Sequence, residues 1–160
     1  MIGIMADSHD NVPAIKQAIL LFREAECKLV IHAGDFIAPF AARELENLGC
    51  PVKAVFGNCD GEKHGLEKVF RSFGEVKEAP LTFSYENLHF LVTHISAHLD
   101  SFLVSGKDNV IISAHTHKPE VKKEKHALLI NPGEAGGWVS GKSTIALLNT
   151  ETLSPEIITL

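Results

Sequence analysis

The sequence has few cysteines, no long apolar run and no excess of positive charge. Its three cysteines are an odd number without a C-x-x-C pair, which argues against a disulfide framework and favours a reducing, cytoplasmic location. The longest apolar stretches, such as residues 18–22 and 128–130, are far shorter than the roughly 18 residues that a membrane helix needs. Met1 leads into an apolar run without the basic segment and cleavage site of a secretory signal. We therefore expect neither a membrane span nor export.

The charge balance is slightly acidic, with 20 Asp and Glu residues against 15 Lys and Arg residues and a formal net charge of −5. This balance disfavours non-specific binding to nucleic acid unless positive charge is concentrated locally or supplied by bound metal. A hydrophobic content of 45% with 22% charged residues is typical of a globular protein. Because 160 residues contain no repeat or Pro/Gly/Ser-rich linker, we expect a single domain over residues 1–160.

Short β-rich runs alternate with helical patterns in the first half, which is typical of βαβ units with parallel strands. Asn11 as an N-cap and apolar residues at three-and-four spacing predict a helix over residues 12–22. A second helix is expected from about 39 to 48, where Gly49 ends it. The expected strands are residues 1–6, 28–33 and 52–56. Three parallel strands thus end at three polar loops.

The second half has closely spaced strands, after a charged and partly helical stretch at residues 61–72. A short helix at about residues 97–104 precedes a strand at 110–114. Antiparallel hairpins are expected from three pairs of runs: 81–85 with 88–93, 121–123 with 128–131, and 144–148 with 156–159. The economical architecture is an α/β domain of two packed sheets with helices outside.

Polar clusters follow the three predicted parallel strands, at the strand ends where ligands bind in open α/β sheets. Asp7 and His9 are two residues apart, so a carboxylate and an imidazole can grip one cation together. Asp35 follows Gly34, and its two carboxylate oxygens can bridge two cations. Asn58 can add a neutral oxygen ligand. Each cluster taken alone is also ordinary helix-capping or turn chemistry.

Histidine is unusually frequent, with nine among 160 residues, and it is the commonest metal ligand. His94 ends one apolar strand, and His115 and His117 follow another in the pattern H-T-H. The His115 and His117 imidazoles can bind at one site only if both side chains leave the core on the same side. For His94 the alternative is a buried core histidine whose ring is hydrogen-bonded. Because all the clusters follow predicted strand ends, we interpret them as one metal-binding site.

The order D-x-H, G-D, G-N-x-D, strand-ending H and H-T-H resembles the calcineurin-like metallophosphoesterases over nearly the whole chain. The N-P-G at residues 131–133 is similar to their small YfcE-type prokaryotic phosphodiesterase branch. The resemblance implies a four-layer αββα sandwich of two packed mixed β-sheets flanked by helices. It also implies a divalent-metal-dependent phosphodiesterase.

The resemblance further implies two metal ions bridged by Asp35 and, between them, a hydroxide that attacks phosphorus in line. Two such cations activate water and stabilise the attacking and leaving oxygens. Four imidazoles and two carboxylates leave the centre cationic, which attracts an anionic phosphoester. Mixed ligation suits Mn²⁺, Fe²⁺, Co²⁺, Ni²⁺ or Zn²⁺ better than Mg²⁺, and the resemblance favours Mn²⁺. The implied ligands besides Asp35 are Asp7, His9 and His117 for one ion, and Asn58, His94 and His115 for the other.

Three positions depart from the family pattern, and one of them is Ala114, where glycine usually precedes H-T-H. Cys59 stands where many larger relatives have a histidine that acts on the leaving group, so an obvious general acid is lost. We interpret Cys59 as a small buried hydrophobe, with a metal-polarised thiol as the alternative. Ile95 stands where glycine is common and is expected to narrow the pocket. His98 is the remaining candidate for binding phosphate or protonating the leaving oxygen, with an exposed helix-start histidine as the alternative. The candidate catalytic residues are Asp35, Asn58 and His98.

The preferred interpretation is an enzyme that hydrolyses a small phosphodiester. A retromer coat subunit has a similar fold and uses it for protein contacts, so a scaffold with weak or no catalysis is the alternative. Retention of every ligand position, including His9, favours the enzyme. A phosphomonoesterase or a nuclease would use the same centre, although the lack of an evident basic groove makes long nucleic acid the weaker substrate. The resemblance also implies a homodimer or homotetramer.

Overall fold

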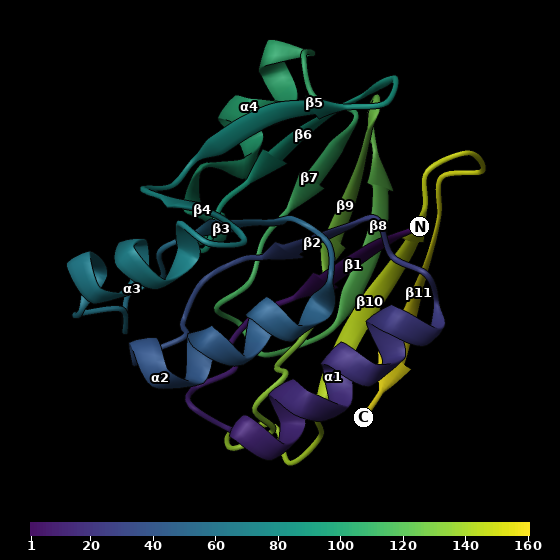
Figure 1. The fold of residues 1–160 in the computed structure, drawn as a ribbon. Coiled ribbons are helices and arrows are strands. Elements are labelled where there is room, and N and C mark those ends of the chain that lie inside the picture. The colour runs from purple at the N-terminus through teal and green to yellow at the C-terminus, as the bar shows by residue number, and fades with distance from the viewer.

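Two β-sheets pack face to face, and helices cover the outer face of each sheet (Figure 1). The computed structural model describes residues 1–160, apart from the side chains of His98 and Ser105. The architecture is the four-layer αββα sandwich of mixed sheets, so the expected fold class is confirmed. Among the described residues, no helix is long and apolar enough to cross a membrane.

The first sheet has six strands in the order β11-β10-β1-β2-β3-β4. Neighbours from β1 to β4 pair in parallel, whereas β10 pairs antiparallel with both β1 and β11. The strand bounds are β1 Ile2–Met5, β2 Leu29–His32, β3 Val52–Val55, β4 Gly74–Lys77, β10 Thr144–Asn149 and β11 Ser154–Thr159. The expected parallel strands and the last hairpin are confirmed, and β4 is an additional strand.

The helices on this sheet follow the apolar pattern of the sequence. The Asn11 side chain accepts a hydrogen bond from the Ala14 backbone N–H and caps α1 (Val12–Glu24), as predicted. The buried face of α1 consists of Ala14, Ile15, Ala18, Ile19 and Phe22. The helix expected over residues 39–48 is instead a short α2 (Pro39–Ala42) that continues as the 3-10 helix η1 (Arg43–Leu48). Gly49, with φ 74°, ends it in the left-handed conformation. The remaining helix is α3 (Lys63–Phe70).

The second sheet has five strands in the order β5-β6-β7-β9-β8. The central strands β6, β7 and β9 pair in parallel, and the outer strands β5 and β8 close antiparallel hairpins, as expected. Its outer face carries the 3-10 helix η2 (Ser96–His98) and α4 (Leu99–Ser105). The strand bounds are β5 Leu81–Tyr85, β6 Leu88–Val92, β7 Val110–Ile112, β8 Glu120–Glu124 and β9 Ala127–Asn131.

The apolar core between the sheets fixes how they face each other. Ile4 and Ile31 of the first sheet belong to the same buried cluster as Phe90 and Ile112 of the second, and each is at most 1% exposed. Burial of such side chains is the main stabilising contribution of the sandwich. Because β1, β2, β3, β6 and β7 are held in this way, the loops that follow them have fixed starting points.

Candidate metal centre

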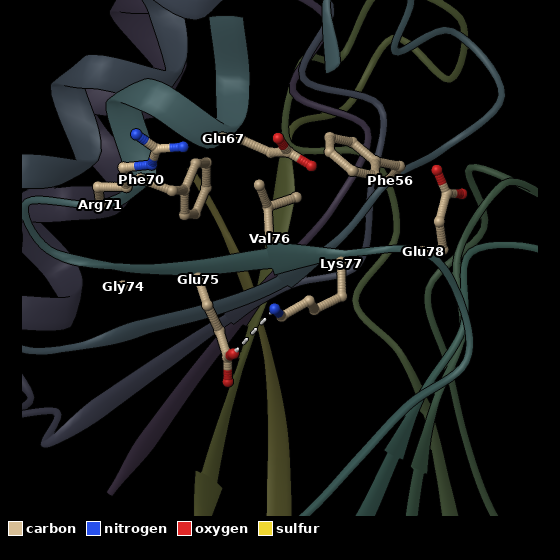
Figure 2. A pocket seen from close by; sticks show the side chains of 9 residues that line it. All are labelled: Phe56, Glu67, Phe70, Arg71, Gly74, Glu75, Val76, Lys77 and Glu78. Atoms are coloured by element: carbon tan, nitrogen blue, oxygen red, sulfur yellow. Dashed lines mark ion pairs between the residues drawn. The ribbon is translucent and has the colours of Figure 1, made fainter. Parts of the chain in front are cut away.

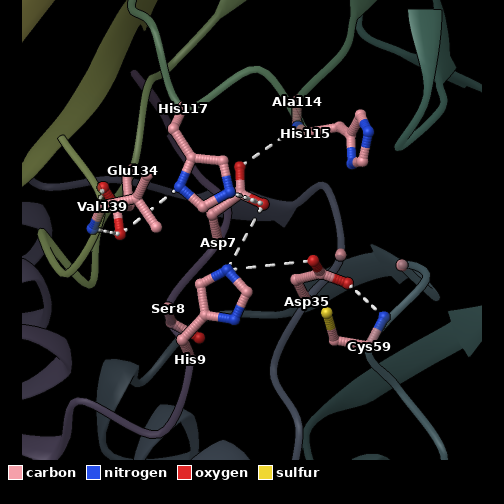
Figure 3. Close-up of polar contacts among 12 residues, drawn as sticks. Asp7, Ser8, His9, Asp35, Cys59, Ala114, His115, His117, Glu134 and Val139 are labelled. Atoms are coloured by element: carbon pink, nitrogen blue, oxygen red, sulfur yellow. Dashed lines mark hydrogen bonds and ion pairs between the residues drawn. The ribbon is translucent and has the colours of Figure 1, made fainter.

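The loops after β1, β2, β3, β6 and β7 meet at one edge of the sandwich (Figure 3). Backbone hydrogen bonds join the first two loops, from Asp7 N to Gly34 O at 2.9 Å and from His9 N to Asp35 O at 3.1 Å. The two sheets are connected where the His115 N–H donates to Asp7 Oδ2 at 3.2 Å. Residues that are distant in sequence therefore share one rigid site.

Three of the predicted ligands gather around the Asp7 carboxylate. Asp7 Oδ1 lies 3.8 Å from His9 Nε2 and 3.7 Å from His117 Nε2. The His9 and His117 rings are stacked, with centroids 5.3 Å apart. Asp35 Oδ2 lies 3.8 Å from His9 Nε2 and so adjoins this group (Figure 3). The structure thus brings together the four side chains predicted for the first ion.

The other predicted ligands lie on the opposite side of Asp35. His94 Nε2 is 3.4 Å from Asp35 Oδ2 and 3.0 Å from Asn58 Oδ1. The exposed His115 ring makes an edge contact with the His94 ring, with centroids 5.3 Å apart. In Figure 3 the His115 ring points away from His117, so the H-T-H pair divides between the two groups. Asp35 adjoins both groups, and Asp7 Oδ1 also lies 4.0 Å from His94 Nε2.

The hydrogen bonds around the predicted ligands leave lone pairs free to bind a divalent cation. His94 Nδ1 is 2.8 Å from the Ala33 carbonyl oxygen and donates to it, which leaves a lone pair on Nε2 of the neutral ring. That lone pair, Asn58 Oδ1 and Asp35 Oδ2 are all acceptors, and they repel one another unless a proton or cation lies among them. Asp7 Oδ1 and His9 Nε2 are buried and have no hydrogen-bond partner among the described residues. The first group therefore presents unpaired metal-binding atoms, and the second presents acceptor atoms that a cation would hold together.

Backbone strain is concentrated at these side chains. The left-handed φ region is uncommon outside glycine and costs about 1–3 kcal/mol for each residue held there. The predicted ligands with positive φ are Asp7 (50°), His9 (42°), Asp35 (60°), His115 (69°) and His117 (59°). Strain of this kind persists where the surrounding structure fixes it, and it clusters at functional sites. The loop conformations thus support the interpretation of this edge as a site.

The two buried carboxyl groups have opposite pKa shifts. Burial raises the pKa of Asp7, and the His94 and His117 rings offset this only in part. Burial also acts to raise the pKa of Asp35, but the adjacent His94 ring and the hydrogen bond from the Cys59 N–H outweigh it and lower the pKa below the usual range. Asp35 is therefore the more strongly ionised of the two.

Asp60 is a buried residue to which the sequence analysis gave no role, although it is the aspartate of the G-N-x-D motif. Its carboxylate accepts backbone hydrogen bonds from Asp35 N at 3.0 Å, Phe36 N at 2.8 Å, Ile37 N at 2.8 Å and Gly57 N at 2.7 Å. These bonds join the loop after β2 to the loop after β3. A Cβ atom at Gly57 would overlap Asp35 Oδ1, so the close approach of these two loops requires glycine at position 57.

Glu134 is a second residue that the sequence analysis missed. It is fully buried and accepts hydrogen bonds from Val139 N at 2.9 Å and Ser140 N at 2.7 Å. Its Oε1 lies 3.4 Å from His117 Nδ1 (Figure 3). Burial acts to raise the pKa of Glu134, but these hydrogen bonds outweigh it and lower the pKa to about 2. An ionised carboxylate behind a histidine orients the ring and sets its tautomer.

Cys59 is exposed, so its interpretation as a buried hydrophobe is wrong. Its backbone N–H donates to Asp35 Oδ1 at 2.8 Å, and this bond holds the side chain at the edge of the site. Desolvation and the nearby Asp35 carboxylate raise the pKa of the Cys59 thiol to about 11. All three cysteines are free, as the sequence predicted. The His98 side chain lies outside the described residues.

Two pockets lie near this end of β3. One, of about 600 Å³, is formed by α3 and β4 and includes none of the predicted ligands (Figure 2). Its wall carries charged side chains, among them Glu67, Arg71 and Lys77. The other, of about 450 Å³, includes Asn58 and His94 in its wall and therefore adjoins the candidate centre.

Comparison with known proteins identifies the family. The calcineurin-like phosphoesterase superfamily domain matches residues 1–153. A relative from Methanocaldococcus jannaschii, named a phosphodiesterase, is 36% identical over 154 residues, which are 94% of this chain and 93% of the relative. A solved archaeal phosphodiesterase is 35% identical with a TM-score of 0.95, and the similarity covers 99% of both chains.

More distant solved structures share the fold alone. YfcE, a phosphoesterase from E. coli, is 17% identical with a TM-score of 0.70, over 98% of this chain and 97% of the other. Vps29 from Entamoeba histolytica, solved with Zn²⁺, is 17% identical with a TM-score of 0.71, over 99% of this chain and 97% of the other. The family match and the archaeal relatives, taken with the site, lead to one conclusion: the chain belongs to the calcineurin-like phosphoesterase superfamily and is a metal-dependent phosphoesterase.

Proposed function

We propose that this phosphoesterase hydrolyses a small phosphodiester and uses two divalent metal ions, preferably Mn²⁺. We also propose that residues 1–160 form one domain. The observation that carries the proposal is the position of Asp35 Oδ2, which faces His9 Nε2 at 3.8 Å and His94 Nε2 at 3.4 Å. One carboxylate thus adjoins both groups of proposed ligands. The relative named a phosphodiesterase supports the choice of a diester.

The proposed ligands form two sets that share Asp35. When bound, the two ions would activate water and stabilise the charge that develops on the phosphoryl oxygens. The buried Asp35 carboxylate keeps its position through the hydrogen bond from Cys59 N at 2.8 Å. The first set adds Asp7, His9 and His117, and the second set adds Asn58, His94 and His115.

The chain's own residues limit which group can protonate the leaving oxygen. His94 is a poor candidate, because its Nδ1 proton is held by the Ala33 carbonyl and its Nε2 faces Asp35. In the metal-free protein, desolvation and the Asp35 carboxylate raise the pKa of the exposed Cys59 thiol to about 11. His98 stays the predicted general acid or phosphate-binding residue, and Asn58 is proposed to help position the phosphate.

Metal restoration is the direct test of this function. The protein is stripped with a chelator and then assayed with each divalent ion on bis-p-nitrophenyl phosphate and on p-nitrophenyl phosphate. We expect Mn²⁺ to restore diester hydrolysis and the diester to be the better substrate. Preference for the monoester would instead indicate a phosphomonoesterase. Bound metal without turnover of either ester would favour the scaffold interpretation, for which Vps29 offers only a likeness of fold.

Replacing Glu134 with glutamine is expected to weaken metal binding about 10- to 100-fold, because the ionised carboxylate that orients His117 is lost. Calorimetric titration of Mn²⁺ into the stripped protein measures the effect. Glu151→Gln is the matched control, since Glu151 is exposed in the turn between β10 and β11. Unchanged affinity in a folded Glu134→Gln protein would rule out this positioning role.

The predicted homodimer or homotetramer and the cytoplasmic location stay predictions from the sequence. Size-exclusion chromatography with light scattering measures the first.

A further inference from the structure

The pocket of about 450 Å³ beside the second proposed ligand set has a composition unlike that of the metal centre. Asn58 and His94 form the part of its wall that belongs to the centre. The rest is largely apolar and comes from the loop after β3, the segment between β4 and β5, the loop after β6, and α4. Its larger apolar side chains are Phe56, Pro80, Ile95 and Phe102.

The pocket wall disfavours a charged occupant. Among the described residues that line it there is no Asp, Glu, Lys or Arg, and His94 is the only side chain that can carry charge. Thr93 adds little polarity, because its hydroxyl already donates to the Ile95 carbonyl at 3.1 Å. Mostly apolar walls with a few polar groups at one end are typical of sites that hold an uncharged organic group and orient it by its polar end.

The position of Ile95 shows that this wall is accessible. Its side chain follows the proposed ligand His94 directly and is 44% exposed, although it is large and apolar. The Thr93 hydrogen bond fixes the turn that presents it. Phe102 and the buried Phe56, whose ring also contacts the Lys63 ammonium, add aromatic side chains from two further elements. The sequence expectation that Ile95 narrows the pocket is therefore consistent with a shaped binding wall.

We propose that this pocket binds an uncharged aromatic ester group of the substrate while the phosphate lies at Asn58 and His94. The inference rests on the proposed function, because the phosphate must lie at the metal centre for its ester group to reach the pocket. The volume of about 450 Å³ is within the range of small-molecule sites and exceeds what a methyl ester would fill. The substrate class is thus an aryl or heteroaryl phosphoester rather than a short-chain alkyl one.

Non-hydrolysable ligands test the pocket without turnover. Phenylphosphonate and methylphosphonate carry the same anionic group and differ only in the organic substituent. Calorimetry on the Mn²⁺-loaded protein should give phenylphosphonate about 10- to 100-fold tighter binding, as expected for burial of a ring. Ile95→Ser and Phe102→Ala should each reduce this ratio several-fold while the bound metal content stays the same. Val104→Ser is the matched control, because Val104 is on α4, 77% exposed and outside the pocket wall.

Each outcome separates the pocket from the metal centre. Equal affinity for the two phosphonates in the unaltered protein would overturn the pocket proposal and leave the phosphoesterase proposal standing. A phenyl preference that persists in Ile95→Ser would also overturn it, and this variant alters an exposed side chain, so it tests the idea even if Phe102→Ala does not fold. Failure of both phosphonates to bind the metal-loaded protein would overturn the proposed function itself, and the pocket proposal with it.

Discussion

An Asp35→Asn variant is expected to hydrolyse the diester at least about 1,000-fold more slowly than the unaltered protein. The reason is that two cations contribute several kcal/mol to catalysis, and about 4 kcal/mol corresponds to that factor. Asp35 Oδ2 faces both His9 and His94, so the neutral amide removes a negative charge that both proposed metal positions share. Initial rates at saturating Mn²⁺, with metal content measured on the same samples, give the result.

The same variant should remain folded. The amide side chain that replaces the Asp35 carboxylate can keep an oxygen at the position of Oδ1, where it accepts the Cys59 N–H, so the loop contact at 2.8 Å survives. Asp100→Asn is the matched control, because it makes the same change in charge at an exposed position on α4. Turnover close to that of the unaltered protein, with two ions still bound to Asp35→Asn, would contradict the bridging role.

The fold was predictable where one physical signal dominated. Three-and-four apolar spacing and the Asn11 cap located α1, and the paired runs around short turns located the hairpins. β4 was missed because its sequence, Gly-Glu-Val-Lys, buries only Val76 and has too little apolar content to predict a strand. Its stability depends on parallel pairing with β3, which is a tertiary contact. The division of residues 39–48 between α2 and η1 was likewise not visible in the apolar pattern.

The candidate site was predictable as a set of residue types, because ligands in such sheets follow strand ends. The structure brings Asp7, His9, Asp35, His94 and His117 together. Asn58 and His115 contact the His94 ring, and the role of all seven as ligands stays a proposal. Asp60 and Glu134 escaped prediction because most of their partners are backbone N–H groups, and such partners leave no pattern in the sequence. The exposure of Cys59 was equally invisible, since it follows from the direction in which the loop after β3 turns.

Asp60→Asn is expected to destabilise the protein by about 3 kcal/mol or more, although Asp60 is not among the proposed ligands. Each Asp60 oxygen accepts two backbone N–H groups, so an amide nitrogen in place of one oxygen faces two donors and loses both bonds. Hydrogen bonds to a charged group contribute about 1.5–3 kcal/mol each. For a chain of this length, the melting temperature should fall by roughly 6–12 °C, which thermal unfolding of the stripped protein measures.

Comparing Asp60→Asn with Asp10→Asn and Asp35→Asn distinguishes a residue that stabilises the loops from one that binds metal. Asp10 Oδ1 accepts a single backbone bond, from Ala38 N at 3.0 Å, which an asparagine oxygen preserves, so Asp10→Asn should change stability by less than about 1 kcal/mol. Asp35→Asn should lose metal and turnover with little change in the stability of the stripped protein, whereas Asp60→Asn should lose stability before any metal is added. Equal melting temperatures for Asp60→Asn and the unaltered protein would show that the four bonds are not needed to hold the loops. The proposed ligands would then owe their positions to the strained loop backbones themselves and to the metal that they bind.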